Sequence, residues 1–523
     1  MAWKLYFGGP IWTMEQRTDA QAVLVEDGVI RAVGPTARNH PQAKMAEQVD
    51  LRGKALLPAF VDAHSHFMAC ANAMLQLSVA QAENFAELQD MMRTHIRKTG
   101  LPAGQWLLVR DFDPSNLQEQ RIPDRTVLDQ AAPEHPVVLQ HRSGHVGVLN
   151  TLALQKMHIT AKTPDPVGGR IERSDAGPTG YLEENAFLNV LNQLPPPELE
   201  QLLAACDRAQ DYYASFGITT AQEGMVTEQM VPLYQALCTQ NRLWIDVVGY
   251  SAFQERVQIE QVLSGQTGHF RLGGYKIFLD GSPQSRTAWM RTPYVGTEMC
   301  GYPTLTDEQV LQAVCQAAQD DRQLLAHCNG DAAAEQYLRA LEQARKQGID
   351  LARAHPVMIH AQLVGLDQLP RLKALGVTPS FFVAHVYHWG EIHRENFGPA
   401  RAAAISPAAS AGDLGLPYTF HQDAPVIPPD MLQTVWCAAT RHTKSGRVLG
   451  GAERVSVYDA LQAVTLHAAQ QYGEQDQKGS IAPGKRADFV ILDRDPLAVA
   501  PDEVRSLKVE QTICGGRTIY QRE

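Results

Sequence analysis

Two histidines one residue apart follow an apolar run near the start of the chain. Residues 55–61, ALLPAFV, lead through Asp62 and Ala63 into His64 and His66. Side chains alternate between the two faces of a strand, so both imidazoles point to the same side and form a ligand pair for a divalent ion. A purely structural role in the core is the alternative interpretation, and other ligand residues decide between the two.

Four further residues with ligand side chains stand at or near the ends of apolar runs. Histidines close the runs 323–327 (QLLAH) and 356–360 (PVMIH), a lysine lies in 274–282 (GYKIFLDGS), and an aspartate follows 418–422 (YTFHQ). Taken singly, each histidine is more often a hydrogen-bonded core residue, and aspartate commonly caps a turn. Their recurrence at several strand ends is hard to explain without a metal ion. The predicted ligands are His64, His66, Lys276, His327, His360 and Asp423.

The lysine of this set has a chemistry of its own. Lys276 lies in a run that is expected to face the interior of the fold, and burial there lowers the pKa of its amine. A neutral amine reacts with carbon dioxide to form a carbamate, an anionic ligand that can bridge two cations. The alternative is a structural ion pair between Lys276 and Asp280.

Strand-like runs alternate with amphipathic helical stretches through the middle of the chain. These runs lie near residues 58–64, 217–223, 243–250, 274–280, 323–328, 356–361, 376–382 and 417–423. Eight βα units predict an α/β protein with a TIM (β/α)8 barrel over residues 58–473 and an active site at the carboxyl ends of its strands. The predicted ligands fall at the ends of the first, fourth, fifth, sixth and eighth runs.

Two additions to the barrel are expected. Residues 1–57 and 474–523 hold short β-rich runs and turns, which predict a small β-sandwich formed by both chain termini. The first two barrel strands are separated by a much longer stretch than a βα connection needs. That stretch predicts an inserted subdomain, about residues 68–200, which acts as a lid and specificity element.

The composition argues against several classes of protein. The chain has 523 residues, of which 44% are hydrophobic, and a net charge of −11 without a long basic run, which argues against nucleic acid and membranes as partners. It lacks a signal-peptide core at its start and any apolar stretch of the ~18–20 residues that a membrane span needs. Eight cysteines without a Cys-x-x-Cys pair indicate reduced thiols. We therefore expect a cytoplasmic protein, and we expect it to be a homo-oligomer, a dimer.

Six motifs carry a resemblance that runs essentially from end to end. They are PAFVDAHSHF at 58–67, KIFLDGS at 276–282, HCNGDA at 327–332, HAQ at 360–362, HQDAPV at 421–426 and GSIAPGKRAD at 479–488. With them the chain resembles the amidohydrolase superfamily, and within it the amidohydrolase-3 branch, which includes N-substituted formamide deformylase. The last motif resembles a strand of the family's C-terminal sandwich and carries no chemistry.

The resemblance implies a metal-dependent hydrolase. By analogy with the family, one divalent ion is held by His64, His66 and Asp423, and a second by His327 and His360, with carboxylated Lys276 between them. Zinc suits these ligands, with iron or manganese as alternatives. Metal-activated water attacks a carbonyl, and Asp423 takes up the proton and returns it to the leaving amine, so Asp423 and Lys276 are the predicted catalytic residues. No glutamate closely follows either strand-end histidine, which disfavours deamination.

Candidate substrate-binding groups lie after the fourth and seventh runs and in the expected insertion. Residues 381–391, FFVAHVYHWGE, resemble a variant loop of the branch, and residues 142–147, RSGHVG, belong to the insertion. The alternative for His385 and His388 is that they are exposed loop histidines, and the alternative for Arg286 is a structural ion pair. The candidates are His145, Arg286, Trp289, Phe381, His385, Tyr387, His388 and Trp389.

The aromatic residues among these candidates predict the substrate class. They suit a small-molecule N-substituted amide, of the formamide or N-acyl amine type, with an apolar or aromatic substituent. Hydrolysis of a carbamate, an ester or a cyclic amide at the same site is an alternative. A further alternative is a non-catalytic binding protein with the same fold.

Overall fold

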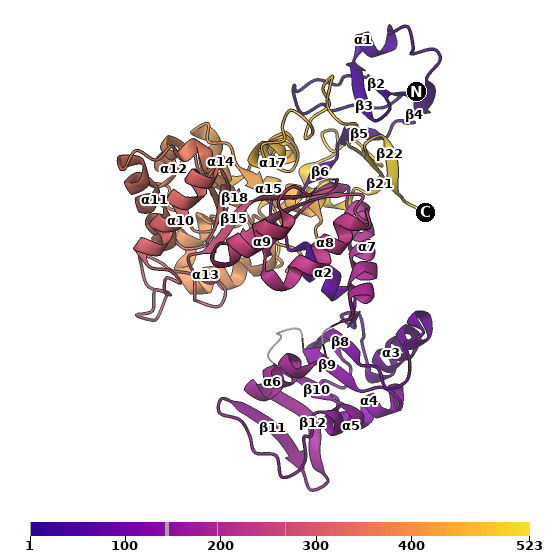
Figure 1. Cartoon of the computed structure of the whole chain (residues 1–523), viewed down its shortest axis with the longest axis vertical. Helices are drawn as coiled ribbons and strands as arrows, with labels where there is room; N and C mark the ends of the chain where they lie inside the picture. Colours follow the sequence, from indigo (N-terminus) through magenta and orange to yellow (C-terminus); the bar gives the residue numbers. More distant parts are fainter. Residues whose placement is uncertain (1, 142–145, 196, 267) are drawn as a thin grey trace. The chain divides into compact units, whose positions relative to one another are not determined.

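The computed structural model describes residues 2–141, 146–195, 197–266 and 268–523. The chain folds into two compact units, one made of Met1–Cys70 with Cys206–Glu523 and the other of Ala71–Ala205 (Figure 1). The stretch expected as an insertion, about 68–200, lies almost entirely in the second unit.

A sheet of eight parallel strands forms the centre of the first unit. The strands are hydrogen-bonded in chain order, from β6 through β13, β14, β15, β16, β17 and β18 to β19. They are β6 (Phe60–Val61), β13 (Ile218–Val226), β14 (Asp246–Ala252), β15 (Phe270–Phe278), β16 (Gln323–Cys328), β17 (Val357–His360), β18 (Thr378–Phe381) and β19 (Thr419–Phe420). Each of the eight runs expected from the sequence contains or overlaps one of these strands.

Helices connect the strands, and α10 (Asp307–Asp320), between β15 and β16, shows how the sequence sets their limits. Thr306 and Gln309 form a capping box at its start, and the chain leaves the helix through Asp321 in the left-handed conformation, with φ 55°. Its buried residues, at positions 310, 313, 314, 317 and 318, follow the helical period. None of the helices in the described ranges combines the length and apolar composition that a membrane span needs.

The helices from α7 onward follow the insertion along the chain, and most of them stand between successive strands of the sheet. They are α7 (Leu199–Ser215), α8 (Val231–Thr239), α9 (Arg256–Leu263), α11 (Asp331–Lys346), α12 (Leu369–Leu375), α13 (His385–Ala403), α14 (Ala408–Asp413), α15 (Met431–Thr440), α16 (Val457–Ala463) and α17 (Leu466–Gln471).

The first and last strands of the sheet meet at their carboxyl ends. The amide of Asp423, after β19, donates to the carbonyl of His64 at 3.2 Å, and the amide of His66, after β6, donates to the carbonyl of Ala424 at 2.8 Å. Buried apolar side chains from β6, β14, β16 and β17 pack into one cluster. These features give a TIM-barrel-like α/β fold, in which residues from the two ends of the sheet come together at one rim.

Two four-stranded sheets contain the chain termini. One has the order β3-β2-β1-β4, and the other the order β22-β21-β20-β5. Their strands are β1 (Trp3–Phe7), β2 (Ala22–Glu26), β3 (Val29–Val33), β4 (Glu47–Asp50), β5 (Ala55–Pro58), β20 (Phe489–Leu492), β21 (Val509–Cys514) and β22 (Arg517–Gln521). Residues of both sheets, among them Val25 and Phe489, share one apolar cluster, and Figure 1 shows the two chain ends on the same side of the first unit.

The turn between β2 and β3 brings the two terminal sheets into close contact. Asp27 and Gly28 both have positive φ, 47° and 81°, as expected for an Asp-Gly hairpin turn. A Cβ on Gly28 would lie 2.4 Å from the carbonyl oxygen of Gly515, in the turn between β21 and β22. Glycine is therefore required here both by its φ and by the approach of the other sheet.

The second unit has its own sheet and core. Its strand order is β11-β12-β10-β9-β8-β7. Its elements are β7 (Leu77–Ser78), β8 (Leu107–Phe112), β9 (Val137–His141), β10 (Val146–Leu149), β11 (Gly169–Ser174), β12 (Gly177–Glu184), α3 (Phe85–Thr99), α4 (Arg125–Ala131), α5 (Thr151–Lys156) and α6 (Asn185–Gln193). On β9, Val137 and Leu139 pack with residues of α3 and α4, whereas Val138 packs with residues of α5 and α6. Helices thus cover both faces of the sheet, as in a domain with an independent core.

Candidate metal centre

His64 lies just after β6, and Gln222 of β13 fixes the orientation of its ring. The amide oxygen of Gln222 lies 2.5 Å from Nδ1 of His64, and its amide nitrogen donates to the Ala63 carbonyl and the Tyr472 hydroxyl, at 2.9 Å each. Because the amide nitrogen has these two acceptors, the amide oxygen faces His64 and accepts the hydrogen bond from Nδ1. Nε2 of His64 is therefore the unprotonated nitrogen, as a metal ligand requires.

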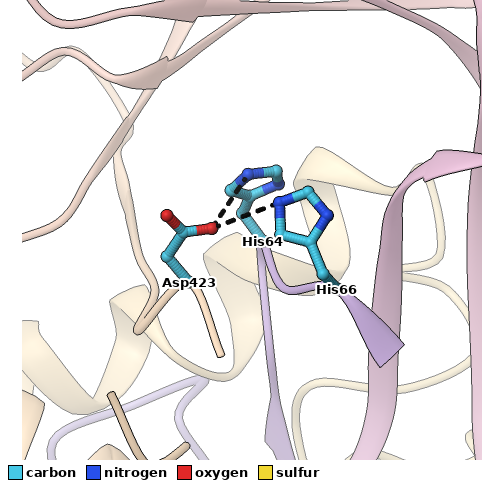
Figure 2. A group of neighbouring side chains, drawn as sticks. All are labelled: His64, His66 and Asp423. Atoms are coloured by element: carbon cyan, nitrogen blue, oxygen red, sulfur yellow. Dashed lines mark ion pairs between the residues drawn. The ribbon is translucent and has the colours of Figure 1, made fainter. Parts of the chain in front are cut away.

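Asp423 brings a carboxylate to both histidines of the pair (Figure 2). Its Oδ1 lies 3.4 Å from Nε2 of His64 and 3.4 Å from Nε2 of His66. One ligand atom from each of the three residues lies within 4.8 Å of the others, and Oδ1 of Asp423 is buried without a hydrogen-bond partner among the described residues. A buried carboxylate oxygen that lacks a hydrogen-bond partner and faces two imidazoles fits a divalent ion bound between the three residues.

His66 lies in a negative environment. Burial alone would lower the pKa of His66, but the carboxylates of Asp423 and Glu223 outweigh that effect and raise it to about 9. Glu223, whose Oε1 is 3.8 Å from Nδ1 of His66, is held in place by hydrogen bonds from the Met68 amide and the Tyr234 hydroxyl, at 2.7 Å each. This part of the site therefore favours a positive charge, which a divalent ion supplies as a proton does.

Lys276 of β15 is buried beside His64. Its Nζ lies 3.4 Å from Nε2 of His64, and burial, opposed by the charge of Asp423, lowers the pKa of Lys276 to about 7. Asp280 instead accepts backbone hydrogen bonds from Trp289, Asn329 and Gly330, at 3.0, 2.9 and 2.7 Å. Within the described ranges no ion pair joins Lys276 to Asp280, so the structural alternative for this lysine is wrong.

His327 and His360, at the ends of β16 and β17, adjoin the three-residue cluster. Their rings lie 4.6 Å apart between centroids, and Nε2 of His360 is 4.0 Å from Oδ2 of Asp423. Nε2 of His327 donates to the Gly281 carbonyl at 3.3 Å, and the Asn329 amide donates to the same carbonyl at 2.8 Å, which leaves Nδ1 of His327 unprotonated for a ligand. Burial lowers the pKa of both histidines, that of His327 to about 4, so both are neutral, as metal binding requires.

His421 is a residue of the site that sequence reasoning quoted but did not nominate. Its Nε2 lies 3.1 Å from Nδ1 of His360, and its Nδ1 lies 2.9 Å from the Ser380 hydroxyl. The signal was its position in the motif HQDAPV, directly after β19 and two residues before Asp423. Gln222 and Glu223 were also missed, and their signal was the presence of two polar residues in the fully buried part of β13.

The segment 381–391, expected to be a loop, is mostly helical. Helix α13 begins at His385 and includes the candidates Tyr387, His388 and Trp389, with non-helical dihedral angles at Trp389. The ring of Tyr387 lies 5.3 Å from that of Trp436, and Nε2 of His388 lies 3.4 Å from the amide oxygen of Gln433. Tyr387 and His388 therefore both make contacts with α15.

Phe381 and Phe382 point to opposite sides. Phe381 is fully buried, with its ring 5.9 Å from that of Tyr418, and is not placed at the metal cluster. Phe382, which was not nominated, lies 6.2 Å from the ring of His360 and 5.3 Å from that of His421. Phe382 thus lies beside two histidines of the site, whereas the substrate-binding candidate Phe381 contacts Tyr418.

Four substrate candidates remain, of which His385, buried in α13, has its Nδ1 3.0 Å from Nε2 of His393. Arg286 donates from Nε to the side-chain oxygen of Asn396 at 2.8 Å, so it anchors α13. Trp289, half-buried, is held through its backbone amide by Asp280. His145 lies outside the described residues.

The fold and the site together define a TIM-barrel-like protein with a candidate metal site at the rim of its parallel sheet. The model of the amidohydrolase family matches residues 47–520, and the chain belongs to this family. The resemblance found in the sequence is thereby confirmed, and the protein is a hydrolase that acts on carbon–nitrogen bonds.

Known proteins resemble the chain over nearly its whole length. The N-substituted formamide deformylase of Arthrobacter pascens is 29% identical over 524 residues, which cover 96% of this chain and 95% of that protein. The putative amidohydrolase YtcJ of Bacillus subtilis (strain 168) is 28% identical over 539 residues, which cover 99% of each. The crystal structure of an uncharacterized metal-dependent hydrolase from Pyrococcus horikoshii OT3 has a TM-score of 0.78 at 24% identity, covers 96% of this chain and 99% of its own, and supports the fold.

Proposed function

We propose that the protein hydrolyses the C–N bond of an N-substituted amide at a divalent metal centre. The observation that carries the proposal is the buried Oδ1 of Asp423, which has no hydrogen-bond partner among the described residues and lies 3.4 Å from Nε2 of both His64 and His66. Two imidazoles and a carboxylate suit zinc, and iron or manganese accept the same ligands. When bound, the ion supplies Lewis acidity, which polarises a carbonyl and activates water.

His327 and His360 hold a second ion in this proposal, and Lys276 joins the two sites as a carbamate. With its pKa at about 7, a large fraction of the Lys276 amine is unprotonated at neutral pH. Its nitrogen then bonds to the carbon of carbon dioxide and releases a proton to solvent. The product places a negative oxygen ligand where an ammonium would otherwise repel the ions.

Asp423 acts as the proton carrier. Burial would raise the pKa of Asp423, but the interaction with His66 outweighs it and holds that pKa below its usual value. The carboxylate is therefore ionised at neutral pH. It accepts a proton from the attacking water and returns it to the nitrogen of the leaving amine. Asp423, His66 and His327 keep 15%, 27% and 16% of their side-chain surface exposed, so water reaches this part of the site.

Phe382 and Trp389 form the apolar side of the substrate site. The buried ring of Phe382 packs against His360 and His421 and lies 6.0 Å from the half-buried ring of Trp389. An apolar substituent beside the scissile bond would contact Trp389, which Phe382 supports from behind. The deformylase of Arthrobacter pascens, 29% identical, is named for N-substituted formamides, which supports the same class of substrate here.

The terminal sheets complete the proposed architecture. The apolar cluster common to both sheets supports a small β-sandwich formed by residues 1–57 and 474–523. Residues 58–473, apart from the insertion, then form the barrel.

The test compares matched substrates on protein with and without metal. The protein is stripped with a chelator, reloaded with zinc, manganese or iron, and assayed with N-benzylformamide and with benzyl formate. We expect the stripped protein to be inactive and reloading to restore hydrolysis. When each kcat/KM is divided by the uncatalysed rate constant of the same substrate, the quotient should be higher for the amide than for the ester. Hydrolysis that persists after the metal is removed, or that is restricted to the ester, would contradict the proposal.

A further inference from the structure

Two buried histidines of α13, His385 and His393, are not among the predicted metal ligands, and His385 is one of the substrate-binding candidates. Nδ1 of His385 lies 3.0 Å from Nε2 of His393, and the two rings stack with their centroids 5.2 Å apart. His385 is 4% exposed and His393 is fully buried. One aromatic ring, that of Phe382, links His385 to the cluster, because it lies 4.5 Å from the ring of His385 and 6.2 Å from that of His360.

The two histidines share a single proton in their hydrogen bond. Burial lowers the pKa of both, that of His393 to about 4, so both rings are neutral. A neutral imidazole has one N–H and one unprotonated nitrogen. Either Nε2 of His393 donates to Nδ1 of His385, or Nδ1 of His385 donates to Nε2 of His393.

The other nitrogen of His393 decides between these directions. Its Nδ1 is buried and has no hydrogen-bond partner among the described residues. Unpaired buried N–H groups are rarer in proteins than acceptors that lack a partner, so Nδ1 of His393 is the unprotonated nitrogen. His393 then donates through Nε2, and His385 carries its own proton on Nε2. Both rings are thus in the Nε2–H form, which is also the more stable tautomer of a neutral histidine side chain.

Helix α13 holds this pair in a fixed position. Asn396 accepts a hydrogen bond from Arg286 at 2.8 Å and donates to the Pro283 carbonyl at 3.0 Å, which ties the helix to the segment after β15. A Cβ on Gly390 would lie 2.5 Å from the side chain of Thr443, so the helix also packs closely on the segment that follows α15. A histidine on such a rigid element is suited to fixed recognition of a substrate atom.

We propose that His385 donates a hydrogen bond from Nε2 to the carbonyl oxygen of the substrate amide, and that His393 is the positioning residue that fixes this tautomer. The inference rests on the proposed amide hydrolysis and adds the group that recognises the scissile carbonyl. A donor aimed at this oxygen gains strength as negative charge develops there. Its effect therefore falls on kcat more than on KM.

The tautomer can be measured without substrate. Protein labelled with 15N in its histidines gives imidazole nitrogen signals, and the signals of His385 and His393 are assigned by their absence from His385→Leu and His393→Leu proteins. We expect Nε2 of both residues to be protonated and Nδ1 of both to be unprotonated near pH 7. A proton on Nδ1 of His385 would overturn the proposal even if the enzyme is fully active.

Paired substitutions test the role in turnover. His385→Leu should lower kcat for N-benzylformamide about 10²-fold, as for the loss of one donor to a developing oxyanion. His385→Gln and His393→Gln keep an amide donor and should each lose less than the corresponding leucine variant. His355→Gln, at an exposed histidine, is the control.

Metal content is measured for every variant, and equal loading with a lower kcat is the result expected. If His393→Leu lowers kcat no more than His355→Gln, His393 has no positioning role and the proposal fails. If the wild type hydrolyses no amide at all, the proposed function fails, while the nitrogen signals still decide the tautomer.

Discussion

The backbone amide of Asp423 donates a hydrogen bond to the carbonyl oxygen of His64 at 3.2 Å. The two residues follow the last and the first strand of the parallel sheet, so this bond holds their side chains together independently of any ion. Asp423 also has a φ of 53°, a conformation that costs energy in a residue other than glycine. The fold thus pre-organises this pair of ligands before a metal binds.

Asp423→Asn should lower kcat/KM for the amide substrate by about 10²–10⁴-fold, because the variant loses the proton carrier. The backbone bond to His64 does not involve the side chain, so the far-UV circular dichroism spectrum should be unchanged. Asp413→Asn, at an exposed position, should have wild-type activity. Retention of full activity in Asp423→Asn would remove this residue from the mechanism.

Gln222→Leu should weaken metal binding by about 10–100-fold, as for loss of a group that orients a ligand histidine. The substitution removes the acceptor that fixes Nδ1 of His64 at 2.5 Å. Competition with a chelator of known affinity measures the effect. Gln235→Leu, at an exposed position of α8, is the matched control, and equal affinities in the two variants would show that Gln222 does not position the ligand.

Lys276 should carry a carbamate whose occupancy rises with pH. Burial lowers the pKa of Lys276 to about 7, so the reactive neutral amine is the minor form below that pH and the major form above it. With 13C-labelled carbon dioxide, the carbamate signal should grow between pH 6 and pH 8 and be absent from Lys276→Ala. That variant should be inactive and partly rescued by a short carboxylic acid. Full activity without such an acid would refute the bridging role.

Gly28→Ala and Gly53→Ala form a matched pair that tests the packing of the terminal sheets. Both glycines have a φ near 80°, but only Gly28 has a neighbour, the Gly515 carbonyl, within 4 Å of the added Cβ. Gly53→Ala should lower the free energy of unfolding by about 1 kcal/mol, the cost of a left-handed alanine. Gly28→Ala should cost about 1–3 kcal/mol more, because the two turns must move apart. Equal costs in denaturant titrations would show that the two sheets do not make this contact.

The cluster of His64, His66 and Asp423 could be predicted from the sequence because it depends on where strands end. The period of two along a strand placed His64 and His66 on one side. Five of the eight apolar runs carry a predicted ligand at or near their carboxyl ends, and these ends meet at one rim in a parallel sheet. The same reasoning, applied to the position two residues before Asp423, would have found His421.

The substrate side was harder to predict, for reasons of geometry. Neighbouring residues of a strand point to opposite faces, so an error of one position reverses the predicted side. Strand β18 ends at Phe381, and the ring of the next residue, Phe382, faces the ligands. Helix α13 was interpreted as a loop because its first turns are rich in aromatic residues and histidine and contain the irregular Trp389. The contact of Gln222 with His64 joins residues far apart in the sequence, and a single chain gives no signal for such a pair.

The metal content of the purified protein, measured by mass spectrometry of the elements, tests the central claim most directly. The wild type should bind at least one equivalent of a divalent transition metal after dialysis, and His64→Ala should retain almost none while remaining folded. A wild type without bound metal that still hydrolyses amides, or a His64→Ala protein with unchanged metal content, would contradict the assignment of His64, His66 and Asp423 as the metal site.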